Sequence, residues 1–292
     1  MDEKKNLKTL LNRTGFVTAP GAYDALTARI VESNGFPAVY MTGYGTSVSG
    51  FGLPDIGFLT MTEMVWNASR MADAIEIPLI ADADTGYGNP MNVTRTIREY
   101  EKAGVSAIQL EDQEWPKRCG HMSGKKVVDL DEMTAKIKAA ADARKDSDFL
   151  IIARTDALAI EGMESAIERA HAYAEAGADI LFVEAPRTKA EMEQIPTMLT
   201  EKPLLINMAP LTPNCSIDEL KDMGFSIAIF PGVCLVASIA ACNEDLQRLK
   251  TTGFQKDFSE LKQSFNDLNN WLKAPYYLEL EQKYKSKSDQ NT

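Results

Sequence analysis

The stretch Glu175-Ala-Gly-Ala-Asp-Ile-Leu-Phe-Val-Glu184 carries the pattern that decides the fold. An amphipathic, helix-like segment (residues 164–175) ends close to Gly177, and a short apolar run then leads to Glu184. A glycine just past a helix supplies the left-handed residue that ends it. An apolar run without polar alternation is typical of a strand buried on both faces. The stretch therefore predicts a helix, then a buried parallel strand with an acidic residue at its end.

The same pattern recurs along the chain, with Gly35, Gly104 and Gly224 in the place of Gly177. Eight strands are expected in all, at residues 15–18, 37–42, 78–82, 107–111, 149–154, 179–184, 203–207 and 226–230. Strands that alternate with helices in this number predict an α/β fold, a (β/α)8 barrel. A doubly wound open sheet is the rival, but no GxGxxG motif opens a helix to support its dinucleotide-binding form.

The expected organisation is a single domain over residues 1–292, with the barrel at about 10–252 and a helical extension at about 253–285. Two helix-like segments in the extension, 256–271 and 275–284, exceed what a barrel of roughly 250 residues requires. The apolar region 227–242 is interrupted by Pro231-Gly232. It predicts a strand, a turn and a buried helix rather than a membrane span.

Composition narrows the classes of partner. Hydrophobic residues make up 45% of the chain and charged residues 25%, as in ordinary globular proteins, and the net charge is −11. An acidic protein is a poor partner for nucleic acid or an anionic membrane, so neither is expected. The charged start of the chain has no apolar segment of the signal-peptide type. The four cysteines have no paired spacing, so we expect reduced thiols and a cytoplasmic protein.

Polar residues stand at the predicted carboxyl ends of six strands. These ends share one face of a parallel barrel, where active sites form, so we expect one pocket there. The residues are Thr42, Gly43, Tyr44, Asp82, Asp84, Glu111, Asp112, Arg154, Asp156, Glu184 and Asn207. Any one of them taken alone could be a loop residue or a helix cap. Their recurrence at successive strand ends favours a functional site.

Asp82 and Asp84 are spaced so that both side chains would point to one side of an extended strand. Two carboxylates held together repel unless a cation lies between them. With Glu111 on the next strand, the small number of carboxylates suits Mg²⁺, or Mn²⁺, better than Ca²⁺. Zinc is less favoured, because His121 is accompanied by only one other histidine, His171, which falls in a predicted helix.

The segment Lys117-Arg-Cys-Gly-His121 places a thiol beside two cations and an imidazole. A thiol in such surroundings could ionise or donate a proton near neutral pH. The loop 113–126 is long for a strand-to-helix connection, and Gly120 and Gly124 could serve as hinges for a closing gate. The other cysteines, Cys215, Cys234 and Cys242, are expected to be packing residues.

These motifs follow the order found in the isocitrate lyase and phosphoenolpyruvate mutase superfamily, which the chain resembles over about residues 10–284. The resemblance rests on Asp-Ala-Asp-Thr-Gly-Tyr-Gly (82–88), Glu-Asp-Gln (111–113), the segment 117–121 and Ala-Arg-Thr-Asp-Ala (153–157). It implies a barrel whose C-terminal helices are exchanged between subunits, in a homotetramer built as a dimer of dimers.

The resemblance also implies a role for each site residue. Asp82, Asp84 and Glu111 would hold the metal, Thr42, Gly43, Tyr44, Asp82, Arg154, Glu184 and Asn207 would bind substrate, and Cys119, Gly120 and His121 would form a gate that also contacts substrate. Asp55 would join the network of metal-bound waters. Cys119, Tyr44 and Arg154 would take part in catalysis.

The Cys-Gly-His gate occurs in carbon–carbon lyases of this family and generally not in its phosphonate mutases and hydrolases. The implied reaction is a retro-aldol cleavage of a substituted malate to pyruvate and a carboxylate, in which Cys119 protonates the carbanion. Tyr44, a metal-bound hydroxide and a carboxylate remain alternative bases.

Members that take the tricarboxylate 2-methylisocitrate carry arginines where this chain has Val236 and, less clearly, Phe265. A dicarboxylate with an apolar substituent, such as 2,3-dimethylmalate, is therefore favoured. 2-Methylisocitrate, oxaloacetate, phosphonate chemistry and a non-catalytic carboxylate-binding role are the alternatives.

Overall fold

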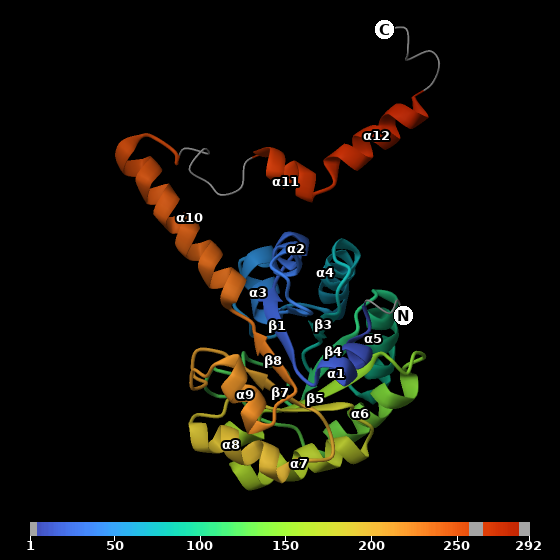
Figure 1. Ribbon diagram of the computed structural model, residues 1–292. Coiled ribbons are helices and arrows are strands. Elements are labelled where there is room, and N and C mark those ends of the chain that lie inside the picture. Colours follow the sequence, from blue (N-terminus) through green and yellow to red (C-terminus); the bar gives the residue numbers. More distant parts are fainter. Residues whose placement is uncertain (1–4, 257–264, 286–292) are drawn as a thin grey trace. The chain divides into compact units, whose positions relative to one another are not determined.

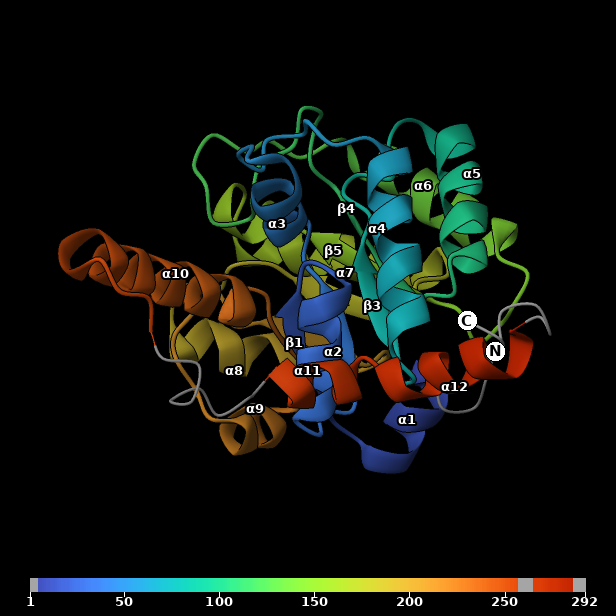
Figure 2. The ribbon, with the colours of Figure 1, turned by 90° about the horizontal axis from the view of Figure 1, so that it is seen from above.

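The computed structural model describes residues 5–256 and 265–285. Eight parallel strands form a closed barrel in chain order, and β8 pairs with β1 to close it. The strands are β1 (Val17–Ala22), β2 (Val39–Met41), β3 (Leu79–Asp82), β4 (Ala107–Glu111), β5 (Leu150–Thr155), β6 (Ile180–Val183), β7 (Leu204–Asn207) and β8 (Ile227–Phe230). Figures 1 and 2 show these strands inside a ring of helices. The predicted (β/α)8 barrel is confirmed.

The helices follow the strands as expected. They are α1 (Leu7–Thr14), α2 (Ala25–Ser33), α3 (Gly43–Thr46), the π-helix η2 (Ser47–Phe51), α4 (Met61–Ala74), α5 (Pro90–Lys102), α6 (Leu130–Ala143), the 3₁₀-helix η3 (Ala157–Ala159), α7 (Met163–Glu175), α8 (Lys189–Met198), α9 (Ile217–Met223), α10 (Val233–Thr252), α11 (Phe265–Trp271) and α12 (Ala274–Tyr284). In α5, Val93, Thr96, Ile97 and Tyr100 are buried. This spacing places them on one face of the helix, which packs toward the sheet.

The interior of the barrel is filled by alternate residues of the strands. Val17 and Ala19 of β1 and Ile180 and Phe182 of β6 belong to this inner cluster, whereas the intervening residues pack against the helices. Leu7, Leu10 and Leu11 of α1 join the same inner cluster. The side chain of Asn6, which caps α1, donates to Asp148 just before β5. Helix α1 therefore closes the amino end of the barrel.

The glycines that mark helix ends have the predicted left-handed conformation. The φ angles are +79° at Gly35, +81° at Gly104, +110° at Gly177 and +104° at Gly224. Side chains with a Cβ rarely adopt this conformation. Each glycine ends its helix and turns the chain into the next strand, as the sequence pattern indicates.

Strand β1 begins and ends later than predicted. Gly15, expected to start it, instead caps α1 with a φ of +69° and donates its N–H to the carbonyl of Leu11. The strand then continues through Pro20-Gly21-Ala22, which sequence reasoning treats as a break. The strand can continue because residue 21 is a glycine. A Cβ at this position would overlap the backbone of Pro231.

The chain divides into two compact units, residues 1–237 and 238–292. The predicted single domain, with an extension from about 253, stays a prediction. In the second unit α12 matches the expected helix 275–284, and α11 matches the end of the expected helix 256–271, most of whose remainder lies outside the described residues.

The buried helix predicted within 227–242 is wrong for the single chain. Helix α10 buries Leu235, whereas Val236 is 65% exposed and Ile239 and Leu246 are also exposed. After its first turn the helix belongs to the second unit.

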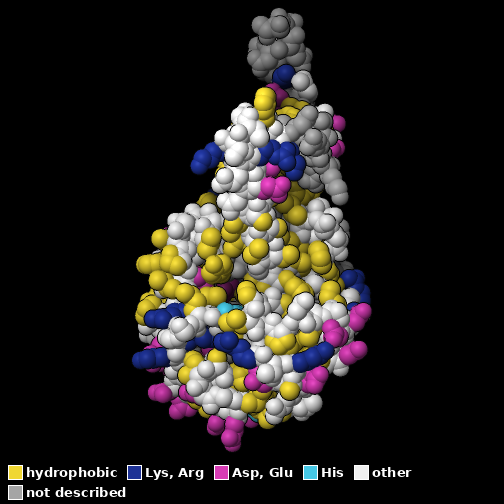
Figure 3. All heavy atoms as spheres, turned by 90° about the vertical axis from the view of Figure 1, so that its left-hand side faces the viewer, with side chains coloured by type: hydrophobic (Ala, Val, Ile, Leu, Met, Phe, Trp, Pro, Cys, Tyr) yellow, Lys and Arg dark blue, Asp and Glu magenta, His cyan; other side chains and the backbone are white. Residues whose placement is uncertain are grey.

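The surface carries many exposed large hydrophobic side chains, including Leu26, Ile30, Phe51, Leu53 and Trp66 of the first unit. Figure 3 shows hydrophobic side chains gathered over one face, with charged side chains below them. Among the described residues, no helix combines the length and the apolar character needed to cross a membrane.

Candidate active site

The predicted site residues surround a cavity of about 310 Å³ at the carboxyl ends of the strands. Its wall includes Tyr40, Thr42, Tyr44, Asp55, Asp82, Glu111, the whole segment 117–121, Arg154, Asn207, Leu235 and Val236. Gly43, Asp84 and Glu184 do not line the cavity but contact residues that do. A larger cavity of about 620 Å³, lined in part by α4, α5 and α6, contains none of the predicted site residues.

Asp82, at the end of β3, is held by backbone donors. Its two carboxylate oxygens accept the N–H of Gly43 at 3.2 Å and that of Asp84 at 3.1 Å. A Cβ at position 43 would overlap the Asp82 carboxylate. Gly43 begins α3, which Thr42 caps through its hydroxyl. The loop after β2 therefore fixes the orientation of Asp82.

Asp84 lies beyond the end of β3 in a left-handed conformation, with a φ of +46°. The expectation that strand alternation aligns it with Asp82 is therefore wrong, because the extended backbone ends at Asp82. The cation beside Asp84 is Lys117, whose Nζ lies 2.6 Å from Asp84 Oδ1 and 2.5 Å from Asp55 Oδ1. All three side chains are buried, so one ammonium group compensates two carboxylates.

The carboxylates nevertheless retain the chemistry of a metal site. Burial, opposed by Lys117 and reinforced by Asp82, raises the pKa of Asp84 to about 7. Burial also raises the pKa of Glu111, whose buried Oε1 has no hydrogen-bond partner. Within residues 5–256 and 265–285, no three His, Cys, Asp or Glu side chains converge on one point. Mg²⁺ commonly takes one or two carboxylates with water and substrate, so an all-oxygen set of Asp82 and Asp84, with Glu111 nearby, fits it.

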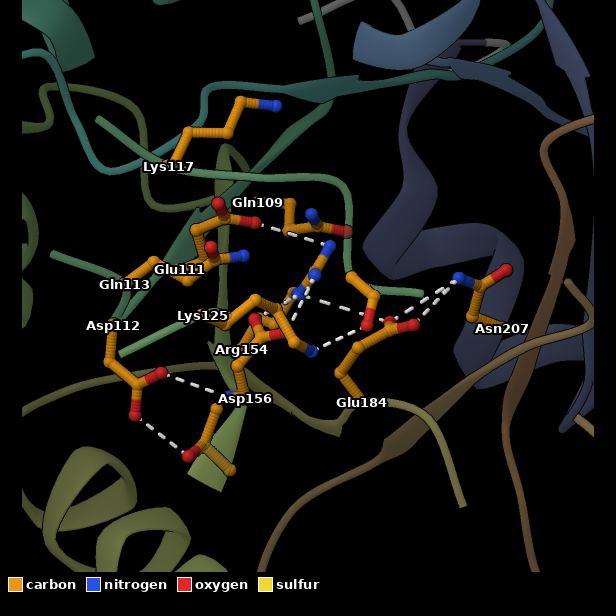
Figure 4. Close-up of polar contacts among 12 residues, drawn as sticks. Gln109, Glu111, Asp112, Gln113, Lys117, Lys125, Arg154, Asp156, Glu184 and Asn207 are labelled. Carbon is orange, nitrogen blue, oxygen red and sulfur yellow. Dashed lines mark hydrogen bonds and ion pairs between the residues drawn. The ribbon is translucent and has the colours of Figure 1, made fainter. Parts of the chain in front are cut away.

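Arg154, at the end of β5, is the central cation of the pocket (Figure 4). Its guanidinium donates to Asp156 from Nε at 2.9 Å and from Nη2 at 3.1 Å, and Nη1 lies 3.2 Å from Glu111. Burial disfavours its charge, but Asp156, Glu111 and Glu184 hold the pKa well above its ordinary value. Arg154 is thus a permanent, oriented cation facing the cavity.

Glu184 connects the barrel to the segment 117–121. Its carboxylate accepts from Asn207 Nδ2 at 3.2 and 3.3 Å, and Oε1 lies 3.0 Å from His121 Nε2. Although burial opposes ionisation, Arg154 and His121 hold the pKa of Glu184 below its usual value. Glu184 therefore carries negative charge where it can orient Arg154 and His121.

Cys119 lies over the cavity with its N–H donating to the Asp55 carbonyl at 3.2 Å. Burial raises the pKa of its thiol, an effect that a hydrogen bond from the backbone of His121 only partly offsets. Of the two chemistries that the sequence leaves open, the surroundings favour a neutral thiol that donates a proton. Gly120 packs so closely on Arg154 and Glu184 that a Cβ would overlap both.

Lys125, Asp112 and Gln109 make contacts at the site that the sequence does not identify, although Asp112 itself is among the predicted strand-end residues. Lys125 donates to Asp156, Asp112 anchors the backbone of Asp156, and Gln109 accepts from the hydroxyl of Tyr40. Asp112 and Asp156 stand at strand ends, so their position is a usable signal. Lys125 has no such signal, because a lysine in a long polar loop is ordinarily exposed.

Two expectations away from the pocket have different outcomes. His171 is a half-exposed helix residue beside Glu201, as expected. The cysteines differ among themselves, since Cys215 is buried and Cys234 is half-buried, but Cys242 is exposed. The interpretation of Cys242 as a packing residue is therefore wrong for the single chain. Phe265 is exposed and belongs to the second unit.

A closed parallel barrel, with buried carboxylates, an arginine and a thiol at its strand ends, defines the chain as an enzyme of the (β/α)8 class. Residues 7–250 match the family described as phosphoenolpyruvate phosphomutase. The chain belongs to the phosphoenolpyruvate mutase/isocitrate lyase superfamily, within which it is a carbon–carbon lyase.

Curated relatives extend over most of the chain. A 2,3-dimethylmalate lyase of Eubacterium barkeri is 44% identical over 286 residues, covering 97% of this chain and 99% of its own length. A chloroplastic carboxyvinyl-carboxyphosphonate phosphorylmutase of Arabidopsis thaliana is 44% identical, with coverages of 94% and 83%. A 2-methylisocitrate lyase of Aeropyrum pernix is 42% identical, with coverages of 86% and 81%.

Solved structures agree with this placement. A crystal structure of 2,3-dimethylmalate lyase superposes with a TM-score of 0.91 at 38% identity, covering 97% of this chain and 95% of its own. Oxaloacetate acetylhydrolase in complex with 3,3-difluorooxalacetate superposes with a TM-score of 0.90 at 39% identity, covering 96% of each chain.

Proposed function

We propose that the protein is a Mg²⁺-dependent lyase that cleaves 2,3-dimethylmalate to pyruvate and propionate. The observation that carries this proposal is the polarity of the cavity. One side presents Arg154, Asp82 and Glu111, while Leu235 and Val236, with Ala209, Pro210 and Pro231, line another part of the wall. A dicarboxylate with methyl substituents matches a cavity that combines charged and apolar walls.

Asp82 and Asp84 would hold Mg²⁺, with Glu111 assisting through water. When bound, the ion would lower the pKa of the substrate hydroxyl and neutralise an adjacent carboxylate. Mn²⁺ is the alternative ion, since it takes the same oxygen ligands.

The protein's own groups divide the remaining tasks. Thr42, Gly43 and Tyr44 would cradle the end that becomes pyruvate, and Arg154 would bind carboxylate oxygens, with Glu184 and Asn207 supporting it. The hydroxyl loses its proton and the C2–C3 bond breaks, so the electron pair remains on C3. Cys119 then gives its thiol proton to C3 to form propionate. Fixed cations near the developing charge stabilise it, because they need no reorganisation during the reaction.

Tyr44 is our candidate for the base that removes the hydroxyl proton, because it lines the cavity and is partly exposed. Tyr40, also in the wall, is a poor alternative, since burial and Asp82 raise its pKa well above the ordinary value. Gly120 and His121 complete the substrate contacts of the closed gate.

The alternative substrate within the class is 2-methylisocitrate, which would yield succinate with pyruvate, and oxaloacetate follows. The additional carboxylate of 2-methylisocitrate requires a cation, and Val236 supplies none. Phosphonate chemistry and a non-catalytic carboxylate-binding role are disfavoured by a protonated thiol positioned over the cavity.

A pyruvate assay coupled to lactate dehydrogenase, with Mg²⁺, compares 2,3-dimethylmalate, 2-methylisocitrate and 2-methylmalate, and oxaloacetate turnover is followed by its loss of absorbance. We expect the highest kcat/KM for 2,3-dimethylmalate. Efficient turnover of 2-methylisocitrate alone overturns the role given to Val236. Turnover that persists after chelation of divalent ions overturns the role given to Asp82 and Asp84.

We further propose a cytoplasmic homotetramer, built as a dimer of dimers through exchange of the C-terminal helices. The exposed apolar residues of α10, α11 and α12 support this assembly, because such side chains ordinarily mark contact surfaces.

A further inference from the structure

The gate loop, residues 113–127, is closed at its base. Gln113 and Val127 form an isolated antiparallel bridge, and the N–H of Glu114 donates to the carbonyl of Lys126 at 2.9 Å. The amide side chain of Gln113 also clamps the backbone of Arg118 with bonds of 2.8 and 2.9 Å. The base therefore holds the first arm of the loop, and further contacts hold the part that carries Cys119 and Gly120 over the cavity.

Lys125 makes one of these contacts, beside the Cys119 N–H bond to the Asp55 carbonyl and the pair of His121 with Glu184. Its Nζ donates to the carbonyl of Gly120 and to Asp156 Oδ1, both at 2.5 Å, and its side chain is only 4% exposed. One ammonium group thus joins the middle of the gate loop to a carboxylate at the end of β5. Removing one partner of a buried ion pair is strongly destabilising, because it leaves the other charge uncompensated.

Asp156 is well suited to receive this contact because its backbone is held in place by Asp112. Its N–H donates to Asp112 Oδ1 at 2.8 Å, and Asp112 also accepts from the hydroxyls of Thr155 and Tyr173. Burial opposes the charge of Asp156, but Arg154 and Lys125 hold its pKa below the ordinary value. With the gate loop in this position, the carboxylate is therefore ionised and fixed in place.

The same carboxylate orients Arg154. Oδ2 accepts from Nε of Arg154, and Oδ1 accepts from both Nη2 of Arg154 and Nζ of Lys125 (Figure 4). Gly120, whose carbonyl Lys125 also holds, lies directly against Arg154 and Glu184. The closed gate and Arg154 are therefore linked through the Asp156 carboxylate, which accepts hydrogen bonds from both Arg154 and Lys125.

We propose that Lys125 is a positioning residue that latches the gate loop shut and, through Asp156, sets the orientation of Arg154. Its side chain contacts the Gly120 backbone but does not itself line the cavity. Lys126, its neighbour, provides a natural comparison, since its side chain is 75% exposed and lies 3.8 Å from the exposed Glu114. Exposed pairs of this kind contribute little to stability. The two lysines thus differ in burial and in what they hold, but not in charge.

The latch is tested without turnover by the rate at which iodoacetamide alkylates Cys119, measured by peptide-resolved mass spectrometry. In Lys125→Met we expect this rate to rise by about tenfold or more, because each 1.4 kcal/mol taken from the closed gate is a factor of ten in its opening. Lys126→Met is the matched control and should alkylate at the rate of the parent. The exposed Cys242 serves as an internal reference in each variant.

A rate for Cys119 in Lys125→Met that equals the parent rate overturns the latch. Lys125→Arg, which keeps the charge and can reach two acceptors, should return the rate to within about threefold of the parent. Circular dichroism and the thermal midpoint check folding. If Lys125→Met does not fold, Lys125→Gln carries the same test, since it keeps a donor but loses the charge.

The link to Arg154 rests on the proposed function and is read separately by kinetics. We expect Lys125→Met to raise KM for the dicarboxylate and lower kcat, whereas Lys126→Met changes neither. Faster alkylation with unchanged KM and kcat keeps the latch but overturns the orienting of Arg154. A parent enzyme without lyase activity refutes the proposed function, while the alkylation rates still decide the latch.

Discussion

At the scale of single residues, the surroundings of Cys119 separate two kinds of thiol chemistry. Lys117 and Arg118 precede it in the sequence and suggest a thiolate. In the structure Lys117 is instead committed to Asp55 and Asp84, and burial raises the pKa of the thiol. Cys119 therefore keeps its proton at neutral pH and can act as an acid, but it is a poor nucleophile.

We expect Cys119→Ser to lower kcat by about 10²–10⁴-fold, the range that general acid catalysis contributes. Serine keeps the shape of the side chain, but its hydroxyl is a far weaker acid. The measurement is the coupled pyruvate assay, with the thermal midpoint as a check of folding. Cys242→Ser, at an exposed position, should leave kcat unchanged. A fully active Cys119→Ser enzyme removes this residue from the mechanism.

Asp84 gives the binding of Mg²⁺ a defined pH dependence. Its pKa, raised to about 7, means that a proton competes with the metal below that pH and does not compete above it. The apparent affinity should therefore be level above about pH 8 and fall by up to tenfold per unit below pH 7. Isothermal titration calorimetry between pH 5.5 and 8.5 measures this, and Asp84→Asn should bind weakly at every pH. An affinity that does not change over this range refutes the assignment.

Six of the residues that line the cavity could be predicted from their places at strand ends, because a parallel barrel brings these ends together: Thr42, Tyr44, Asp82, Glu111, Arg154 and Asn207. The residues that hold these side chains in place could not be predicted. Lys117 is drawn between Asp55 and Asp84, and Lys125 reaches Asp156, through loop conformations that no periodic pattern encodes. Asp84 shows the same limit, since it lies in a left-handed conformation two residues beyond the end of the strand.

At the scale of elements, the closure of the barrel between β1 and β8 depends on a small residue. Pro20 of β1 is in register with Phe230 of β8. The next residue, Gly21, passes so close to Pro231 that any side chain would meet its backbone. Here backbone packing replaces the side-chain packing seen between other strands.

Gly21→Ala should lower the free energy of unfolding by about 1–3 kcal/mol, the usual cost of overpacking. Urea unfolding followed by circular dichroism measures the loss. The control is Gly50→Ala, because a Cβ there meets nothing within 4 Å and its φ is not left-handed. If the two variants lose equal stability, the close approach of Gly21 to Pro231 does not account for the loss in Gly21→Ala.

Seven of the eight strands lie within two residues of their predicted limits, since each is an apolar run bounded by a glycine or a charged residue. Strand β1 departs because its Pro-Gly pair resembles a turn in sequence. Helix α10 departs for a different reason. Its apolar composition predicts a helix that is covered, but sequence alone does not say whether the same chain supplies the cover.

At the scale of the whole molecule, the exposed apolar side chains point to assembly. They include Val233, Ile239, Leu246, Phe254 and Tyr277. Monomeric proteins rarely expose apolar patches larger than a few hundred Å². Light scattering coupled to size exclusion should give a mass near four times the 32.2 kDa of the chain. A monomeric mass across the micromolar range contradicts the proposed tetramer.

The leucines of α1 that close the amino end of the barrel have a consequence for substrate entry and product release. With that end covered and the interior filled by side chains, ligands reach the cavity from the carboxyl ends of the strands. In the proposed reaction the substrate and both products would use this route, so the gate loop would have to open in every cycle. The product that leaves more slowly would then keep the next substrate out, and its release would limit kcat.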